Sequence, residues 1–160
     1  MSRKIKIIAF ILLLTTLGFA REYLFVGINS TLYFKEVNDV NQHPFAIEKY
    51  LAYFSYNTLS KAKWILTPLS AFIFWIVQKQ FLFFLFNEGK PVLWLNIFYI
   101  LLFVLAGIFF VGGWSLGNVT QGYTFSRLFM GILQSPVPCM VLIPIMFLYK
   151  SEDSFRRDGW

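Results

Sequence analysis

Cys139 and His43 are the two residues of this chain whose types could form a nucleophilic catalytic pair. They are its only cysteine and its only histidine. Cys139 falls well inside an apolar stretch, where a lone thiol usually behaves as a small hydrophobic side chain. His43 falls in a connecting loop, whereas a Cys–His pair requires both groups at one depth. We therefore expect no catalytic residue in this chain.

Other chemistries find even less support among the residues. No metal-ligand spacing, phosphate-binding loop or pair of carboxylates occurs in the apolar stretches, so we expect neither a metal nor another cofactor. All eight acidic residues fall in the connections or, for Glu22, at the outer end of the first apolar segment, whereas proton-coupled transporters normally carry ionisable groups inside the membrane. Lys79 is expected to extend its long side chain to the membrane surface. The net charge of +6 is scattered along the chain, which argues against nucleic-acid binding.

The elements that must position any site are membrane helices. The chain is 58% hydrophobic and 14% charged, and four apolar segments approach or exceed the roughly 20 residues that cross a bilayer. The sequence predicts an all-α, polytopic membrane protein that forms one domain over residues 1–160. Its four predicted transmembrane helices span about residues 7–25, 64–86, 92–114 and 128–149, with an outer loop at 26–63.

Local signals refine the first two spans. A basic head before a short apolar run also fits a cleavable signal peptide, but the apolar run continues beyond Arg21 and Glu22, which favours an uncleaved anchor. Adjacent residues do not face each other on a helix, so this pair is expected at the outer interface. Thr67 and Pro68 predict an N-cap and a first helical residue. Residues 44–59 before them fit either an interfacial helix or part of one long helix.

The fourth span is interrupted by polar residues and prolines. Gln134 and Ser135 precede two of its three prolines, and a proline inside a helix removes one backbone hydrogen bond. The sequence therefore predicts a bend or break between Leu133 and Pro138. Two interpretations remain open, a kink that only packs the bundle and a site that contacts a partner or ligand. The prolines expected to produce the kink are Pro136, Pro138 and Pro144.

The distribution of Lys and Arg predicts the orientation of the spans. Placing both termini in the cytoplasm leaves seven cations in the short inner segments and six in the much longer outer ones. The density inside is then about three times higher, as the positive-inside rule requires. We therefore expect a multi-pass protein with both termini cytoplasmic.

Several segments resemble small exosortase-associated membrane proteins of Bacteroidetes, the exosortase F or X type system-associated proteins. The matching segments are REYLF (21–25), LYFK (32–35), YNTLS (56–60), SRLF (126–129), QSP (134–136) and LIP (142–144). The resemblance implies an accessory of a protein-sorting transpeptidase in the bacterial inner membrane, with no known activity of its own. The sorting enzyme of such systems uses Cys, Arg and His, but Cys139, Arg127 and His43 lack its local context here. The match therefore favours an accessory over an enzyme.

The leading functional hypothesis is a non-enzymatic accessory that docks on a larger integral membrane protein and contacts membrane lipids. The residues expected to contact the partner or a ligand are Arg127, Gln134, Ser135, Tyr56, Asn57 and Ser60. One alternative is a small oligomeric carrier or channel-like protein, and another is a membrane-embedded thiol transpeptidase.

Overall fold

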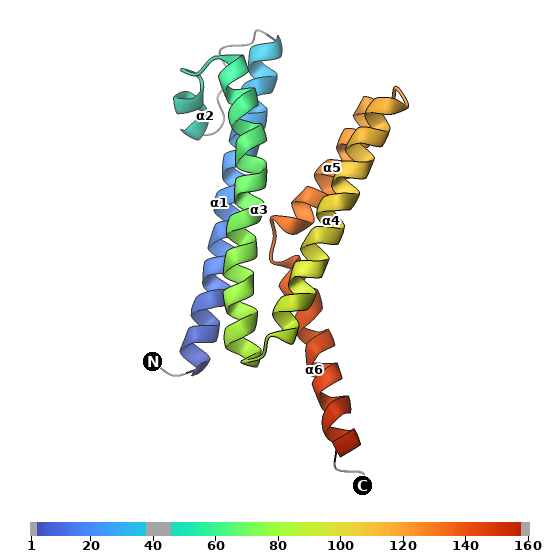
Figure 1. Cartoon of the computed structure of the whole chain (residues 1–160). Coiled ribbons are helices and arrows are strands. Elements are labelled where there is room, and N and C mark those ends of the chain that lie inside the picture. Colours follow the sequence, from blue (N-terminus) through green and yellow to red (C-terminus); the bar gives the residue numbers. More distant parts are fainter. Residues whose placement is uncertain (1–2, 38–45, 158–160) are drawn as a thin grey trace.

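Long helices dominate the computed structural model, which describes residues 3–37 and 46–157 (Figure 1). The helices are α1 (Arg3–Val37), α2 (Ala46–Leu51), α3 (Tyr56–Phe86), α4 (Lys90–Ser115), α5 (Val119–Leu133) and α6 (Val137–Arg157). No strand occurs within these ranges. The protein is all-α, as the sequence predicts.

Three of the helices are long and apolar enough to cross a membrane by themselves, namely α1, α3 and α4. α5 and the apolar part of α6 pass the same test together, and they are bent by 58° at a short break. The predicted polytopic membrane protein is thereby confirmed, with three spans or, where the bent pair forms one broken span, the predicted four.

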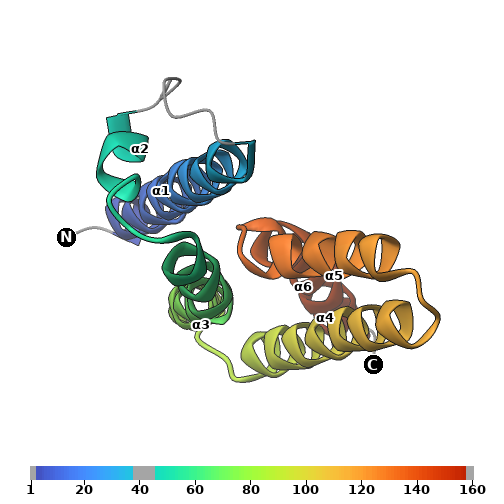
Figure 2. The ribbon, with the colours of Figure 1, turned by 90° about the horizontal axis from the view of Figure 1, so that it is seen from above.

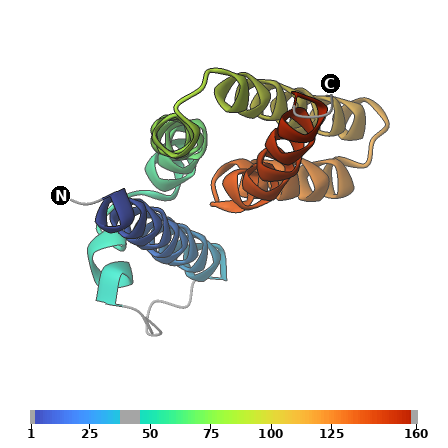
Figure 3. The same ribbon diagram turned by 90° about the horizontal axis from the view of Figure 1, so that it is seen from below.

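The helices form two hairpins joined at one end (Figure 1). α1 and α3 lie side by side in one hairpin, and α4 and α5 form the other. The hairpins diverge toward the end that carries α2, as the view along the bundle also shows (Figure 2). From the opposite end, α6 lies next to α4 (Figure 3). The start of α1 and the end of α6 point toward the same end of the molecule.

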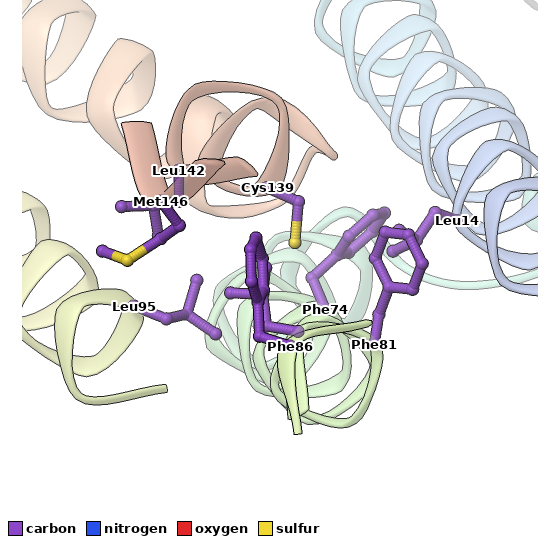
Figure 4. Close-up of a cluster of buried hydrophobic side chains, with 9 residues drawn as sticks. Leu14, Phe74, Phe81, Phe86, Leu95, Cys139, Leu142 and Met146 are labelled. Carbon is purple, nitrogen blue, oxygen red and sulfur yellow. The ribbon is translucent and has the colours of Figure 1, made fainter. Parts of the chain in front are cut away.

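The main core lies where the hairpins meet (Figure 4). It combines Leu14 of α1, Phe81 and Leu82 of α3, Leu95 of α4 and Leu142 of α6, none of which is more than 5% exposed. The surfaces of α4 and α1 elsewhere remain largely apolar and exposed, as expected for helices that face lipid. A polar bond supports the packing of α3 on α4, since Trp75 Nε1 donates to Asn96 Oδ1 at 2.9 Å.

Two glycines of the second hairpin let the backbones of α4 and α5 approach each other closely. A β-carbon added to Gly113 would lie 2.5 Å from Gly122 Cα, and one added to Gly122 would lie 2.6 Å from both Gly113 Cα and Phe109 O. Small residues of this kind allow the backbones of membrane helices to approach closely. On the side of this contact that is nearer the helix break, the Phe109 ring packs on Phe125 and Phe129, with centroids 5.3 and 5.4 Å apart.

The first helix is longer than the sequence predicts. Residues 26–37, assigned to an outer loop, continue α1 to Val37. Thr31 is 1% exposed and its hydroxyl donates to the Gly27 carbonyl at 2.8 Å. The buried hydroxyl therefore finds its hydrogen-bond acceptor within its own helix. α2 packs against this part of α1.

The third helix also begins earlier than expected. Ser55 caps it, because its hydroxyl accepts from Thr58 N at 3.2 Å. Pro68 lies inside α3 rather than at its first position, so the predicted start at Thr67 and Pro68 is wrong. Residues 56–59 belong to one long helix with the second span, which is the alternative prediction for this region. The residues before them form a separate short helix, α2. In the fourth span, residues 119–127 belong to α5 rather than to a loop.

Candidate functional site: a polar junction at the helix break

The break in the fourth span is built by Ser135 and the prolines around it. α5 ends at Leu133 and α6 begins at Val137, which confirms the predicted break. The Ser135 hydroxyl donates to the Ile132 carbonyl at 2.7 Å and accepts from Val137 N at 3.3 Å. This one hydroxyl therefore forms a hydrogen bond with the last turn of α5 and another with the first turn of α6. Pro138 is buried in that first turn, and Pro144 lies farther along α6.

Gln134 connects three segments of the chain at this break. Its side-chain oxygen accepts from Arg21 Nε at 3.0 Å and from Arg21 Nη2 at 2.8 Å. Its side-chain nitrogen donates to the Thr67 carbonyl at 2.7 Å. Because Gln134 is only 2% exposed, these bonds replace the water that its amide would otherwise need. α1 and α3 are both tied to the break through this one side chain.

Two further side chains donate hydrogen bonds to backbone carbonyl groups at the break. Gln78 Nε2 donates to the Ser135 carbonyl at 2.6 Å, and the Tyr99 hydroxyl donates to the Leu133 carbonyl at 2.8 Å. A broken helix inside a membrane exposes carbonyl groups that must find donors within the protein. We call the whole set the polar junction. Its members are Arg21, Thr67, Gln78, Tyr99, Gln134 and Ser135.

The charge within the polar junction is balanced locally. Arg21 Nη1 lies 2.7 Å from Glu22 Oε2, and the two side chains are 22% and 62% exposed. Arg21 lies near the middle of α1, where it bonds to the helix break. Each nitrogen of the guanidinium already donates a hydrogen bond. The arrangement can therefore lock helices together, but it presents no vacant cationic group to a substrate.

Cys139 lies in the main core (Figure 4), on the first turn of α6 after the break. It is 2% exposed, and its sulfur lies 4.0 Å from the Gln78 carbonyl oxygen. Arg127 is exposed on α5, on the other side of the helix break. His43 lies outside the described residues. Among the residues that are described, no group of three or more His, Cys, Asp or Glu side chains could hold a metal ion.

The residues expected to contact a partner do not form one surface. Gln134 and Ser135 belong to the polar junction, and Arg127 lies on α5, the helix that ends just before them. Tyr56 and Asn57 are exposed at the start of α3 and Ser60 is partly buried there. Thr67, which meets Gln134, lies eleven residues beyond Tyr56, or about 16 Å along the helix. The two groups of predicted site residues are therefore separate.

Sequence reasoning missed four members of the polar junction, namely Arg21, Thr67, Gln78 and Tyr99. Thr67 takes part through its backbone carbonyl, which the type of side chain does not reveal. For Arg21 a signal was available, since the apolar run that continues after it indicates a position inside the helix. Gln78 is a polar residue within the apolar stretch 64–86, and such residues usually face other helices. Tyr99 carried no signal, because tyrosine is common in membrane helices for other reasons.

A second feature lies at the far end of the first hairpin, where aromatic side chains are exposed. Tyr50 is 73% exposed, Tyr53 89%, Phe54 51% and Tyr56 46%. All four lie on the end of α2, the turn that follows it and the first residue of α3. We call them the α2–α3 aromatic cluster.

The turn that carries this cluster is held in place by hydrogen bonds. Lys35 Nζ donates to the Ala52 carbonyl at 2.9 Å and to the Phe54 carbonyl at 2.6 Å. The cap formed by Ser55 at the start of α3 fixes the other side of the turn. The α2–α3 aromatic cluster is therefore presented by a supported backbone.

No protein-family model, no curated protein and no solved structure matches this chain.

Proposed function

We propose that this protein is a non-catalytic accessory of a larger integral membrane protein, on which it docks through the α2–α3 aromatic cluster. The observation that carries the proposal is the exposure of four aromatic side chains on one short, supported connection. Tyrosine and other aromatic residues are enriched at binding hot spots, since they bury much area with few rotatable bonds. A protein partner that covers them would remove this large apolar surface from water.

The lengths of the helices favour a contact at the membrane edge. α1 and α3 contain 35 and 31 residues, or about 52 and 46 Å, whereas the hydrocarbon core is about 30 Å thick. The ends that carry α2 therefore extend past the hydrocarbon core. Lys49 and Lys61 are exposed near the cluster, which favours a partner surface with acidic groups.

The polar junction supports a structural rather than a transporting role for the break. A carrier or channel would need polar groups of the break to meet its cargo. Here the Leu133 and Ser135 carbonyls and the Gln134 amide already have partners inside the protein. This supports the accessory proposal over the carrier.

The identity of the partner follows from the resemblance described above. We propose a protein-sorting transpeptidase of the exosortase type in the bacterial inner membrane. In this arrangement both termini are cytoplasmic and the α2–α3 aromatic cluster faces the outside. The higher density of Lys and Arg in the short connections at the opposite end supports this orientation.

The orientation makes a direct prediction for reporter fusions. Fusions at Lys90 and after Trp160 are expected to report the cytoplasm, and a fusion near Gln42 the outside. Paired reporters that are active on opposite sides of the membrane, such as alkaline phosphatase and a fluorescent protein, measure this. A reporter after Trp160 that is active only outside would contradict the orientation.

Docking through the aromatic cluster predicts site-specific cross-linking. A photo-crosslinking amino acid in place of Tyr53 should capture the sorting enzyme, whereas the same amino acid in place of Phe19 should capture much less. Phe19 is a matched control because it is 74% exposed but lies on α1 near its middle. The double variant Tyr50→Ala, Tyr53→Ala should lower recovery of the enzyme at least about fivefold at unchanged abundance.

Two outcomes would contradict the proposal. Equal recovery of the enzyme by the wild type and the double tyrosine variant would remove the cluster as the docking surface. Loss of substrate processing in Cys139→Ala, at normal abundance and normal recovery of the enzyme, would favour a thiol enzyme instead. We expect Cys139→Ala to retain processing, since the buried thiol packs in the core.

A further inference from the structure

Two cations occupy facing sides of α3 and α5. One face of α3 carries Lys63, Thr67 and Gln78. These residues are separated by four and then eleven positions, which are close to one and three full turns of an α-helix. This face points at the break, since Thr67 accepts from Gln134 and Gln78 donates to Ser135. Lys63 lies one turn before Thr67 and so nearer the start of α3. The start of α3 lies at the end of the molecule where the hairpins diverge (Figure 1).

Arg127 lies on the corresponding face of α5. It is four residues after Tyr123 and seven before Gln134, so the three residues lie on one side of the helix. Both of its companions contact α3, because Lys63 Nζ is 5.8 Å from the centroid of the Tyr123 ring and Gln134 bonds to Thr67. Arg127 is nevertheless exposed. The space beside it is therefore not filled by α3.

Neither cation is neutralised within the part of the chain that the structure describes. The ion pair found there joins Arg21 to Glu22, and no carboxylate pairs with Lys63 or Arg127. Lys63 directly precedes the apolar stretch that begins at Trp64, which puts it at the depth of lipid headgroups. α3 and α5 run in the same direction (Figure 1), and helical side chains lean toward the N-terminal end. The Arg127 guanidinium is thus directed toward the same depth.

We propose that Lys63 and Arg127 together bind the phosphate of an anionic phospholipid between α3 and α5. Arginine offers a planar set of donors that fits two phosphate oxygens, and lysine adds a point charge. Basic sites between membrane helices suit anionic headgroups because a lipid brings the charge without leaving the membrane. The acyl chains would lie along the apolar flanks of the diverging hairpins. The site is independent of the α2–α3 aromatic cluster.

Native mass spectrometry of the purified, delipidated protein in detergent tests this site. Phosphatidylglycerol is added stepwise, and the dissociation constant of the first bound molecule is measured. Lys63→Gln and Arg127→Gln should each weaken binding about fivefold, as expected for one lost cation at the membrane surface. Arg127→Lys should lose less than Arg127→Gln. Phosphatidylcholine, which has the phosphate but no net charge, should bind more weakly than phosphatidylglycerol to the wild type.

Lys61→Gln provides the matched control, because Lys61 is exposed on the same helix but lies about 200° around it from Lys63. Binding by this variant should equal that of the wild type. An equal loss in Lys61→Gln and Lys63→Gln would overturn the proposal, since it would reveal only a general effect of charge. Displacement of the lipid by millimolar inorganic phosphate would show that the site binds free phosphate, and it would overturn the assignment to a phospholipid. Unchanged lipid binding in Arg127→Gln, with weaker cross-linking to the partner enzyme, would assign Arg127 to a partner's carboxylate instead.

Discussion

Replacement of Gln134 by Leu is expected to lower the free energy of unfolding by about 2–3 kcal/mol. The substitution removes the oxygen that accepts both Arg21 Nε and Arg21 Nη2. The Thr67 carbonyl keeps the Ser70 hydroxyl as a donor at 2.9 Å, so most of the loss falls on the arginine. The Arg21 side chain is 22% exposed, which keeps the effect below that of a fully buried charge. Unfolding by titration with sodium dodecyl sulfate, followed by circular dichroism, measures it.

The double variant Arg21→Leu, Gln134→Leu separates a true coupling from two independent losses. It is expected to lose less stability than the sum of the single variants, because neither residue then leaves a polar partner without a bond. Glu22→Gln is the control, since the Glu22 side chain is 62% exposed and should contribute little. Strictly additive losses in the double variant would contradict the bond network assigned to Gln134.

Gly113→Ala and Gly122→Ala should each destabilise the protein by about 2–3 kcal/mol, because the added carbon meets backbone rather than a flexible side chain. A β-carbon on either glycine would come within 2.6 Å of the facing helix. α4 and α5 must then separate, which also loosens the packing of Phe109 on Phe125 and Phe129. The same detergent titration measures the loss, and a disulfide engineered between the helices would report their separation.

Gly112 and Gly107 are the matched controls for this prediction. Both lie on α4, and a β-carbon on either would meet nothing within 4 Å. Gly112→Ala and Gly107→Ala should therefore be neutral or stabilise the helix by up to about 1 kcal/mol. Gly113→Ala that is tolerated as well as Gly112→Ala would show that the two helices are not in direct backbone contact.

The polar junction and the glycine contact act on the same element, α5. The glycines fix its first half against α4, and Gln134 fixes its end against α1 and α3. Arg127 lies between these two attachments. Variants at Gly113 or Gly122 should thus also weaken phospholipid binding, although neither glycine touches the lipid.

Local chemistry alone determined the class of fold and the place of the break. The apolar stretch 92–114 predicted α4 to within two residues at each end, since length and composition suffice to define a membrane span. The break between Leu133 and Val137 followed from Ser135 and Pro136, because a missing N–H and a capping hydroxyl act on neighbouring atoms. The sequence did not predict where α1 ends or where α3 begins. Asn29, Ser30 and Thr31 are typical of a loop, yet they continue the helix.

Only the tertiary structure decided which residues form the polar junction. Arg21 and Gln134 are 113 residues apart in the chain, and a sequence pattern carries no information on pairs at such a distance. The sequence placed Arg21 at a membrane surface, where water would satisfy it. The folded protein places it beside the broken helix, because a guanidinium held away from water needs an acceptor and Gln134 supplies one. In the same way, Gly113 and Gly122 differ from the glycines next to them only through the helix that each one faces.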